Sequence, residues 1–169
     1  MPTIMPDDLE KISVGLLIGA GVSIHEAKVV SRLSISANLA GHDSHGIIQI
    51  PSYIDRVNRG HIVPGAEYEV VKDTPTTTVV DGHWGFGYVV TERLMMQTVE
   101  KAKSQNIAAA TVYRQSHIGR LAAYPLIAAH AGMIGMITAD SGRSSKAVVP
   151  FGGREKRLGT NPISIAMPS

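Results

Sequence analysis

Hydrophobic positions recur at helical spacing along the first third of the chain. Residues 7–20 repeat apolar side chains at intervals of three and four, and Gly19 and Gly21 follow the last of them. Glycine directly after such a pattern is typical of the end of a helix. Asp7 or Asp8 is placed to cap the start of this first helix.

Two further helices are predicted after it. Ser23 and Glu26 have the spacing of a capping box at the start of a second apolar face. The segment 41–46, Gly-His-Asp-Ser-His-Gly, then interrupts the helical periodicity. A third helix follows, and Pro51 must either kink it or lie near its start.

The pattern changes to that of strands after residue 65, where we place a domain boundary. Residues 68–72 and 76–80 are runs of β-branched side chains joined by Asp-Thr-Pro, which predicts a hairpin. Residues 88–104 return to helical spacing. The chain is therefore expected to combine an N-terminal helical subdomain, residues 1–65, with an α/β domain over residues 66–169.

A strand, helix, strand unit is predicted next. Residues 107–112 are short and uninterruptedly apolar, as in a strand buried on both faces, and a helix over 119–131 precedes a strand over 133–138. A right-handed crossover would make the two strands parallel. Functional loops are then expected at their carboxyl ends, at 113–118 and 139–147.

Composition narrows the class of protein. The 169 residues are 44% hydrophobic, the formal net charge is only +2, and there is no cysteine. Disulfides, thiolate zinc sites and a cysteine nucleophile are thereby excluded. So small a charge argues against a dedicated nucleic-acid binder, and no apolar run approaches the roughly 20 residues of a membrane span. We expect a cytoplasmic protein with neither a nucleic-acid nor a membrane partner.

Two loops place serine beside histidine between flexible glycines. They are residues 41–46, which include Ser44 and His45, and residues 114–119, which include Ser116 and His117. Imidazole has an unperturbed pKa of about 6.5, so it can exchange a proton at neutral pH. The alternative is that the serines are helix caps and the histidines ordinary polar residues.

The second loop also has features of an anion site. A helix that begins at Gly119 would leave backbone N–H groups free, and Arg120 beside them would suit the phosphates of a cofactor. Alternatively, Arg120 is a solvated residue of the first turn. Gly85-Phe86-Gly87 is only a partial dinucleotide fingerprint, because its third glycine and the later acidic residue are missing.

A metal site is a rival interpretation of the first loop. His42 and His45 flank Asp43, and imidazole and carboxylate are common zinc ligands. The sequence supplies no evident third ligand nearby. We therefore assign no residue to a metal.

Several of these segments together resemble one enzyme family. The stretches that carry the resemblance are Asn38–Gly46, Ile50–Tyr53, Ser116–Arg120, and Val149–Gly153 with Gly159–Pro162. In order and spacing they are similar to the malate/L-lactate dehydrogenase type 2 family, and most of all to its hydroxycarboxylate dehydrogenase branch. The resemblance implies hydride transfer between NAD or NADP and a small 2-hydroxy or 2-oxo acid, a non-Rossmann cofactor-binding domain and a homodimer.

The resemblance also implies roles for particular residues. His117 matches the catalytic histidine of the family, and Ser44 with His45 match the pair that lines the substrate and the nicotinamide. The turn formed by Gly119, Arg120 and Leu121 matches a cofactor-binding turn. Ser141 matches a further cofactor contact.

Two departures from the family bear on the substrate. Many members carry arginine where this chain has Gln49, and glutamine cannot supply the charge that grips a carboxylate. Many members also carry Asn-Ser where this chain has Arg114-Gln115, and Arg114 could supply a displaced carboxylate contact. The identity of the acid is left open.

The length of the chain suggests a fragment. Family members are about twice as long, and this chain stops directly after a predicted strand over 163–167. The expectation is therefore the N-terminal part of an NAD(P)-dependent dehydrogenase that is inactive by itself. The alternative is a catalytically silent truncated protein or binding module that needs a partner chain.

Overall fold

The computed structural model describes residues 3–140 and 146–169, which fold into two compact units. The first unit ends at Arg120 and the second begins at Leu121. The domain boundary that the sequence indicates near residue 65 falls within the first unit and stays a prediction. None of the described helices is long and apolar enough to cross a membrane.

The first unit begins with the three predicted helices, α1 (Pro6–Gly19), α2 (Ile24–Leu39) and α3 (Ile50–Asn58). The prediction that Asp7 or Asp8 caps α1 was wrong, because Met5 occupies the N-cap position and no side chain caps the helix. Helix α1 starts at Pro6, and Asp7 and Asp8 lie in its first turn, where carboxylates are favourable beside the helix dipole. Pro51 lies in the first turn of α3, where its missing N–H costs nothing.

The N-terminus of α2 has the predicted capping residues and a further contact. The Ser23 hydroxyl accepts the Glu26 backbone N–H at 3.3 Å and donates to the Glu26 carboxylate at 3.0 Å. Both carboxylate oxygens of Glu26 also accept the backbone N–H of Gly65 at 2.9 Å. The cap of α2 therefore also holds the segment that leads into the sheet.

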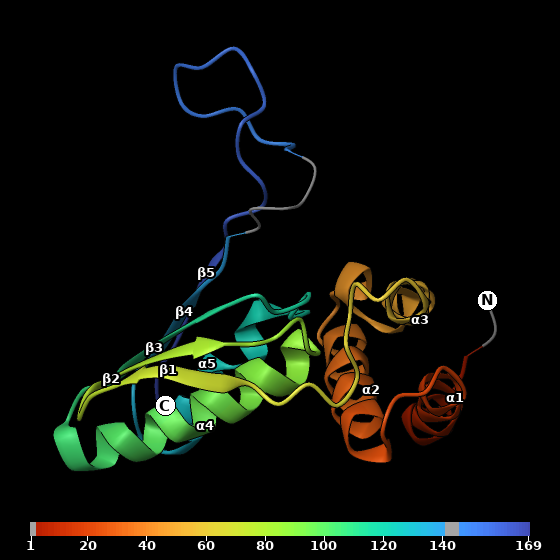
Figure 1. Ribbon diagram of the computed structural model, residues 1–169, viewed down its shortest axis with the longest axis horizontal. Coiled ribbons are helices and arrows are strands. Elements are labelled where there is room, and N and C mark those ends of the chain that lie inside the picture. Colours follow the sequence, from red (N-terminus) through yellow and green to blue (C-terminus); the bar gives the residue numbers. More distant parts are fainter. Residues whose placement is uncertain (1–2, 141–145) are drawn as a thin grey trace. The chain divides into compact units, whose positions relative to one another are not determined.

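A three-stranded sheet completes the first unit. Strands β1 (Glu69–Asp73) and β2 (Thr77–Asp81) form the predicted hairpin, and β3 (Ala109–Tyr113) pairs parallel to β2. Helix α4 (Gly87–Gln105) makes the crossover from β2 to β3 and runs along one face of the sheet (Figure 1). Side chains of β3 alternate between exposed and half-buried, so the prediction of a strand buried on both faces was wrong: α4 covers one face only.

The second unit is small. A 3₁₀ turn (Leu121–Ala123) leads into α5 (Pro125–His130), followed by β4 (Gly135–Thr138) and β5 (Ile163–Ala166). The helix predicted over 119–131 is thus shorter than expected. Strand β4 pairs antiparallel with β5, which corrects the parallel pair predicted between 107–112 and 133–138. Ser141 lies outside the described residues.

Candidate active site

The first histidine loop is fastened to the end of α2. The side-chain oxygen of Asn38 accepts the Ile47 N–H at 2.8 Å, and its amide nitrogen donates to Asp43 at 2.5 Å. Within the loop, the Ser44 hydroxyl and His45 Nδ1 are 2.9 Å apart. Gln49 donates its amide to the Ser44 carbonyl at 2.7 Å. The serine and the histidine are therefore held by contacts on both sides of the loop.

The second histidine loop follows β3 and is held against the start of α4. The Gly87 N–H donates to the Ser116 hydroxyl at 2.8 Å, and the Ser116 N–H donates to the Gly85 carbonyl at 3.2 Å. A side chain at Gly87 would collide with the backbone carbonyls of Ser116 and His117. Glycine at the helix start is therefore required for the loop to approach so closely.

These attachments bring the two histidines together. The ring centroids of His45 and His117 lie 5.5 Å apart. Two buried tyrosines, Tyr53 on α3 and Tyr88 on α4, lie beside His117 with ring centroids at 6.0 Å and 6.4 Å. Four segments of the first unit thus meet at one cluster of titratable side chains.

A chain of hydrogen bonds sets the tautomer of His117. Tyr88 donates to the His45 carbonyl at 3.4 Å, and this carbonyl can only accept. The Tyr88 hydroxyl, which has already donated its proton, therefore accepts a hydrogen bond from the Tyr53 hydroxyl at 3.1 Å. Because the single hydroxyl proton of Tyr53 is used in that bond, Tyr53 accepts a hydrogen bond from His117 Nδ1 at 2.8 Å. In the neutral imidazole the proton lies on Nδ1, which leaves Nε2 as the basic atom.

The surroundings also keep His117 neutral. Burial lowers its pKa from 6.5 to about 4, and electrostatic interactions with His45 and Arg56 contribute to the decrease. An imidazole with so low a pKa is unprotonated at neutral pH. His117 therefore combines the form and the tautomer that a proton acceptor at Nε2 requires.

Arg114 does not face this cluster as an available cation. Its guanidinium forms a two-pronged ion pair with Asp81, in which Nε and Oδ1 are 2.9 Å apart. The pair lowers the pKa of the Asp81 carboxyl to about 2. This guanidinium already holds a carboxylate of its own chain, and the carboxylate contact suggested for Arg114 from the sequence stays a prediction.

The predicted cofactor turn lies directly after His117. Gly119 has φ of +66° and packs against Tyr88, which leaves no room for a side chain. Arg120 places its Nε out of solvent without a hydrogen-bond partner among the described residues. Gly119 is not the first residue of a helix, so the expected helix N-terminus is absent at this point. Leu121 opens the second unit.

The side chains of the rival metal site have separate partners. His42 Nδ1 lies 3.3 Å from the Ala40 carbonyl, Asp43 accepts from Asn38, and His45 contacts Ser44. Over residues 3–140 and 146–169, no three His, Cys, Asp or Glu side chains are grouped so that they could hold a metal ion.

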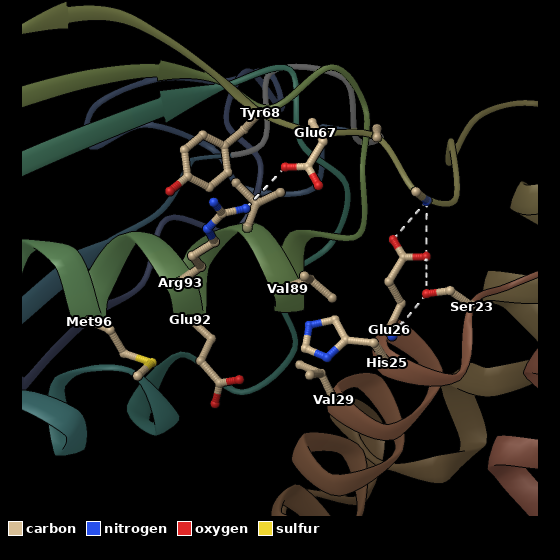
Figure 2. A pocket seen from close by; sticks show the side chains of 13 residues that line it. Ser23, His25, Glu26, Val29, Glu67, Tyr68, Val89, Glu92, Arg93 and Met96 are labelled. Carbon is tan, nitrogen blue, oxygen red and sulfur yellow. Dashed lines mark hydrogen bonds and ion pairs between the residues drawn. The ribbon is translucent and has the colours of Figure 1, made fainter.

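A cavity of about 340 Å³ lies elsewhere in the first unit, between α2, the segment before β1 and α4 (Figure 2). It includes none of the residues that the sequence singled out for chemistry. The charges around it are paired: Arg93 with Glu67 at 3.1 Å, and the Glu26 carboxylate with the Gly65 N–H. Arg93 also lies over the Tyr68 ring at 4.7 Å.

Sequence reasoning brought His45, Ser44 and His117 into the site but assigned no role to the two tyrosines. Tyr53 stands only within a stretch that carries the family resemblance, and Tyr88 carries none of the predicted roles; both side chains are buried. A buried tyrosine hydroxyl needs a hydrogen-bond partner, and this requirement is the one reason that the sequence offers for examining the two tyrosines. Only the fold shows that the partners are each other and His117.

Comparison with known proteins agrees with the family resemblance. Residues 4–169 match the family model described as malate/L-lactate dehydrogenase. L-sulfolactate dehydrogenase of Methanocaldococcus jannaschii is 35% identical over 161 residues, which are 95% of this chain and 46% of that protein. Hydroxycarboxylate dehydrogenase B of Escherichia coli strain K12 is 38% identical over 148 residues, 88% of this chain and 41% of that one.

Solved structures give the same result. Malate dehydrogenase from Pyrococcus horikoshii superposes with a TM-score of 0.94 at 33% identity, over 99% of this chain and 47% of that one. The sulfolactate dehydrogenase of M. jannaschii gives 0.92 at 35% identity, over 97% and 47%. The chain spans about half the length of the relatives it matches. The predicted mixed α/β fold, as the N-terminal part of such a protein, is thereby confirmed.

Proposed function

Since the chain belongs to the malate/L-lactate dehydrogenase family, we propose that it is the N-terminal part of an enzyme that transfers hydride between NAD or NADP and C2 of a small 2-hydroxy or 2-oxo acid. The observation that carries this proposal is the tyrosine chain behind His117. It ends at a carbonyl that can only accept, so the basic nitrogen of a neutral, partly buried imidazole is left for a substrate.

His117 acts as the base in the oxidising direction. Its Nε2 takes the proton of the substrate hydroxyl as the hydride leaves the same carbon, and Nδ1 stays bound to Tyr53 throughout. His45 lies opposite, with Nδ1 occupied by Ser44, so its Nε2 remains to hydrogen-bond the substrate or the cofactor. Ser44 and His45 thus position the acid against His117.

The cofactor is bound by the turn that follows His117. When bound, the nicotinamide accepts or gives the hydride. Arg120 fits an anionic group, because its buried Nε lacks a partner among the described residues. The proposed cofactor-binding residues are His45, Gly119, Arg120, Leu121 and Ser141.

The complete protein is proposed to act as a cytoplasmic homodimer. The residues described here leave apolar side chains of β4 and β5 exposed, among them Met136, Ile163 and Ile165. We expect the 169 residues alone to bind cofactor weakly and to be inactive.

Titration of the complete protein with NADH and NADPH tests the cofactor assignment. Saturable binding of one nucleotide, weakened about tenfold or more by Arg120→Ala, is expected if Arg120 contacts a phosphate. Arg59→Ala is the control, since Arg59 is exposed and paired with Asp55 at 2.9 Å. An unchanged affinity in Arg120→Ala would remove Arg120 from the cofactor site.

A further inference from the structure

A 2-hydroxy acid requires a group that binds its carboxylate, and neither of the two positions that the sequence raises for this purpose, Gln49 and Arg114, offers an unpaired cation. Gln49 is uncharged and donates its amide to the Ser44 carbonyl at 2.7 Å. Arg114 is engaged with Asp81. A substrate carboxylate at the His45–His117 cluster would therefore lack a charged partner from either residue.

Helix α3 carries another cation, Arg56, on the face that includes Tyr53. Gln49, Tyr53 and Arg56 are spaced by four and three residues and so share one face of the helix. Tyr53 places that face against His117, with its hydroxyl 2.8 Å from Nδ1. Long side chains on a helix lean toward its N-terminus, which directs Arg56 back over the turn that carries Tyr53.

The guanidinium of Arg56 is available for a ligand. It is exposed, and in the part of the chain that the structure describes it forms no ion pair. Arg59, one turn further along, is instead paired with Asp55. Arg56 is also one of the charges that lower the pKa of His117, which agrees with a position near that ring.

We propose, building on the function proposed above, that Arg56 binds the substrate carboxylate and takes the place of a cation at position 49. The planar guanidinium can donate two parallel hydrogen bonds to a carboxylate. Arg56 would hold the acid at one end while His117 Nε2 faces the hydroxyl at the other. In a substrate with two acid groups, the second acid group would then have to be bound by residues other than Arg56.

The test uses oxamate, a small carboxylate that resembles a 2-oxo acid. Its affinity for the complete protein is measured by calorimetry, with and without NADH or NADPH, in the wild type, Arg56→Gln, Arg56→Lys and Arg59→Gln. We expect Arg56→Gln to weaken binding about tenfold or more and Arg56→Lys to weaken it less. Arg59→Gln removes the same charge from the same helix and should stay within about twofold of the wild type.

The possible outcomes separate the two proposals. Equal binding by Arg56→Gln and the wild type, an equal loss in Arg59→Gln, or no binding by the wild type at millimolar oxamate overturns the role of Arg56. A wild type that binds oxamate through Arg56 but oxidises no 2-hydroxy acid supports the carboxylate site and rejects the proposed hydride transfer. Turnover of a 2-hydroxy acid with a KM that is unchanged in Arg56→Gln supports the proposed hydride transfer and rejects the role of Arg56.

Discussion

The properties of His117 depend on residues that are distant in sequence. Tyr53 accepts its Nδ1 proton, Tyr88 fixes the direction of that hydrogen bond, and burial keeps the ring neutral. The histidine itself could be singled out from the sequence, because it lies in a glycine-flanked loop with serine. Its tautomer could not, since the tautomer is set by a bond that spans two elements and ends at the His45 carbonyl.

Tyr53→Phe tests the hydrogen-bond chain. The variant removes the acceptor of the Nδ1 proton, so the tautomer with the proton on Nε2, which is unable to act as a base, becomes more populated. We expect kcat to fall about tenfold or more with little change in cofactor affinity, and the pKa in the pH profile of kcat/KM to shift.

The control for Tyr53→Phe is Tyr68→Phe, which also deletes a tyrosine hydroxyl in a hydrogen bond, to Gln97 at 2.6 Å. Tyr68 lies outside the histidine cluster, so its variant should keep the kcat and the pH profile of the wild type. An equal decrease of kcat in both variants would show that Tyr53 is only structural.

The pKa of His117 also predicts how stability depends on pH. Its folded-state pKa is lowered from 6.5 to about 4, so the unfolded chain binds a proton over that interval while the folded chain does not. The free energy of unfolding should therefore decrease as the pH falls from about 6.5 to about 4. Denaturant unfolding across this range should show a smaller decrease in His117→Gln, and identical slopes in both proteins would contradict the shift.

At the scale of elements, periodicity predicted the helices and the hairpin but not every pairing. The pattern located the strands over 109–113 and 135–138 to within two residues. It could not choose their partners, because pairing depends on which segment returns to the same sheet. Helix α4 gives the crossover between β2 and β3, whereas β4 meets β5 after a long excursion of the chain.

Glu26→Gln tests how the cap of α2 supports the first unit. The buried carboxylate accepts from Gly65 and Ser23, and the amide of glutamine can replace only part of these bonds. Loss of hydrogen bonds to a charged group should cost about 1.5–3 kcal/mol. Urea denaturation measures this as a lower midpoint.

Glu100→Gln is the matched control for Glu26→Gln. Glu100 is an exposed helix residue paired with Lys103, and such surface pairs contribute about 0.5 kcal/mol or less. Equal midpoints for Glu26→Gln and Glu100→Gln would show that the contact with Gly65 has no structural weight.

At the scale of the whole molecule, the family follows from matches that extend over residues 4–169. The cluster of His45, His117, Tyr53 and Tyr88 lies entirely in the first unit, whereas the proposed cofactor residues continue into Leu121 and Ser141. The chain spans about half the length of its relatives, so the proposed activity is to be tested on the complete protein. The sequence predicted the family through the order and spacing of its motifs, which composition alone does not provide.

Transfer of deuterium from substrate to nicotinamide tests the central claim most directly. The complete protein is incubated with NAD or NADP and a panel of 2-hydroxy acids that carry deuterium at C2, and the reduced nucleotide is analysed by mass spectrometry. We predict deuterated NADH or NADPH with at least one acid, formed about 100-fold or more slowly by His117→Ala. No deuterated nucleotide from the folded wild type, or an undiminished rate in His117→Ala, would contradict the account.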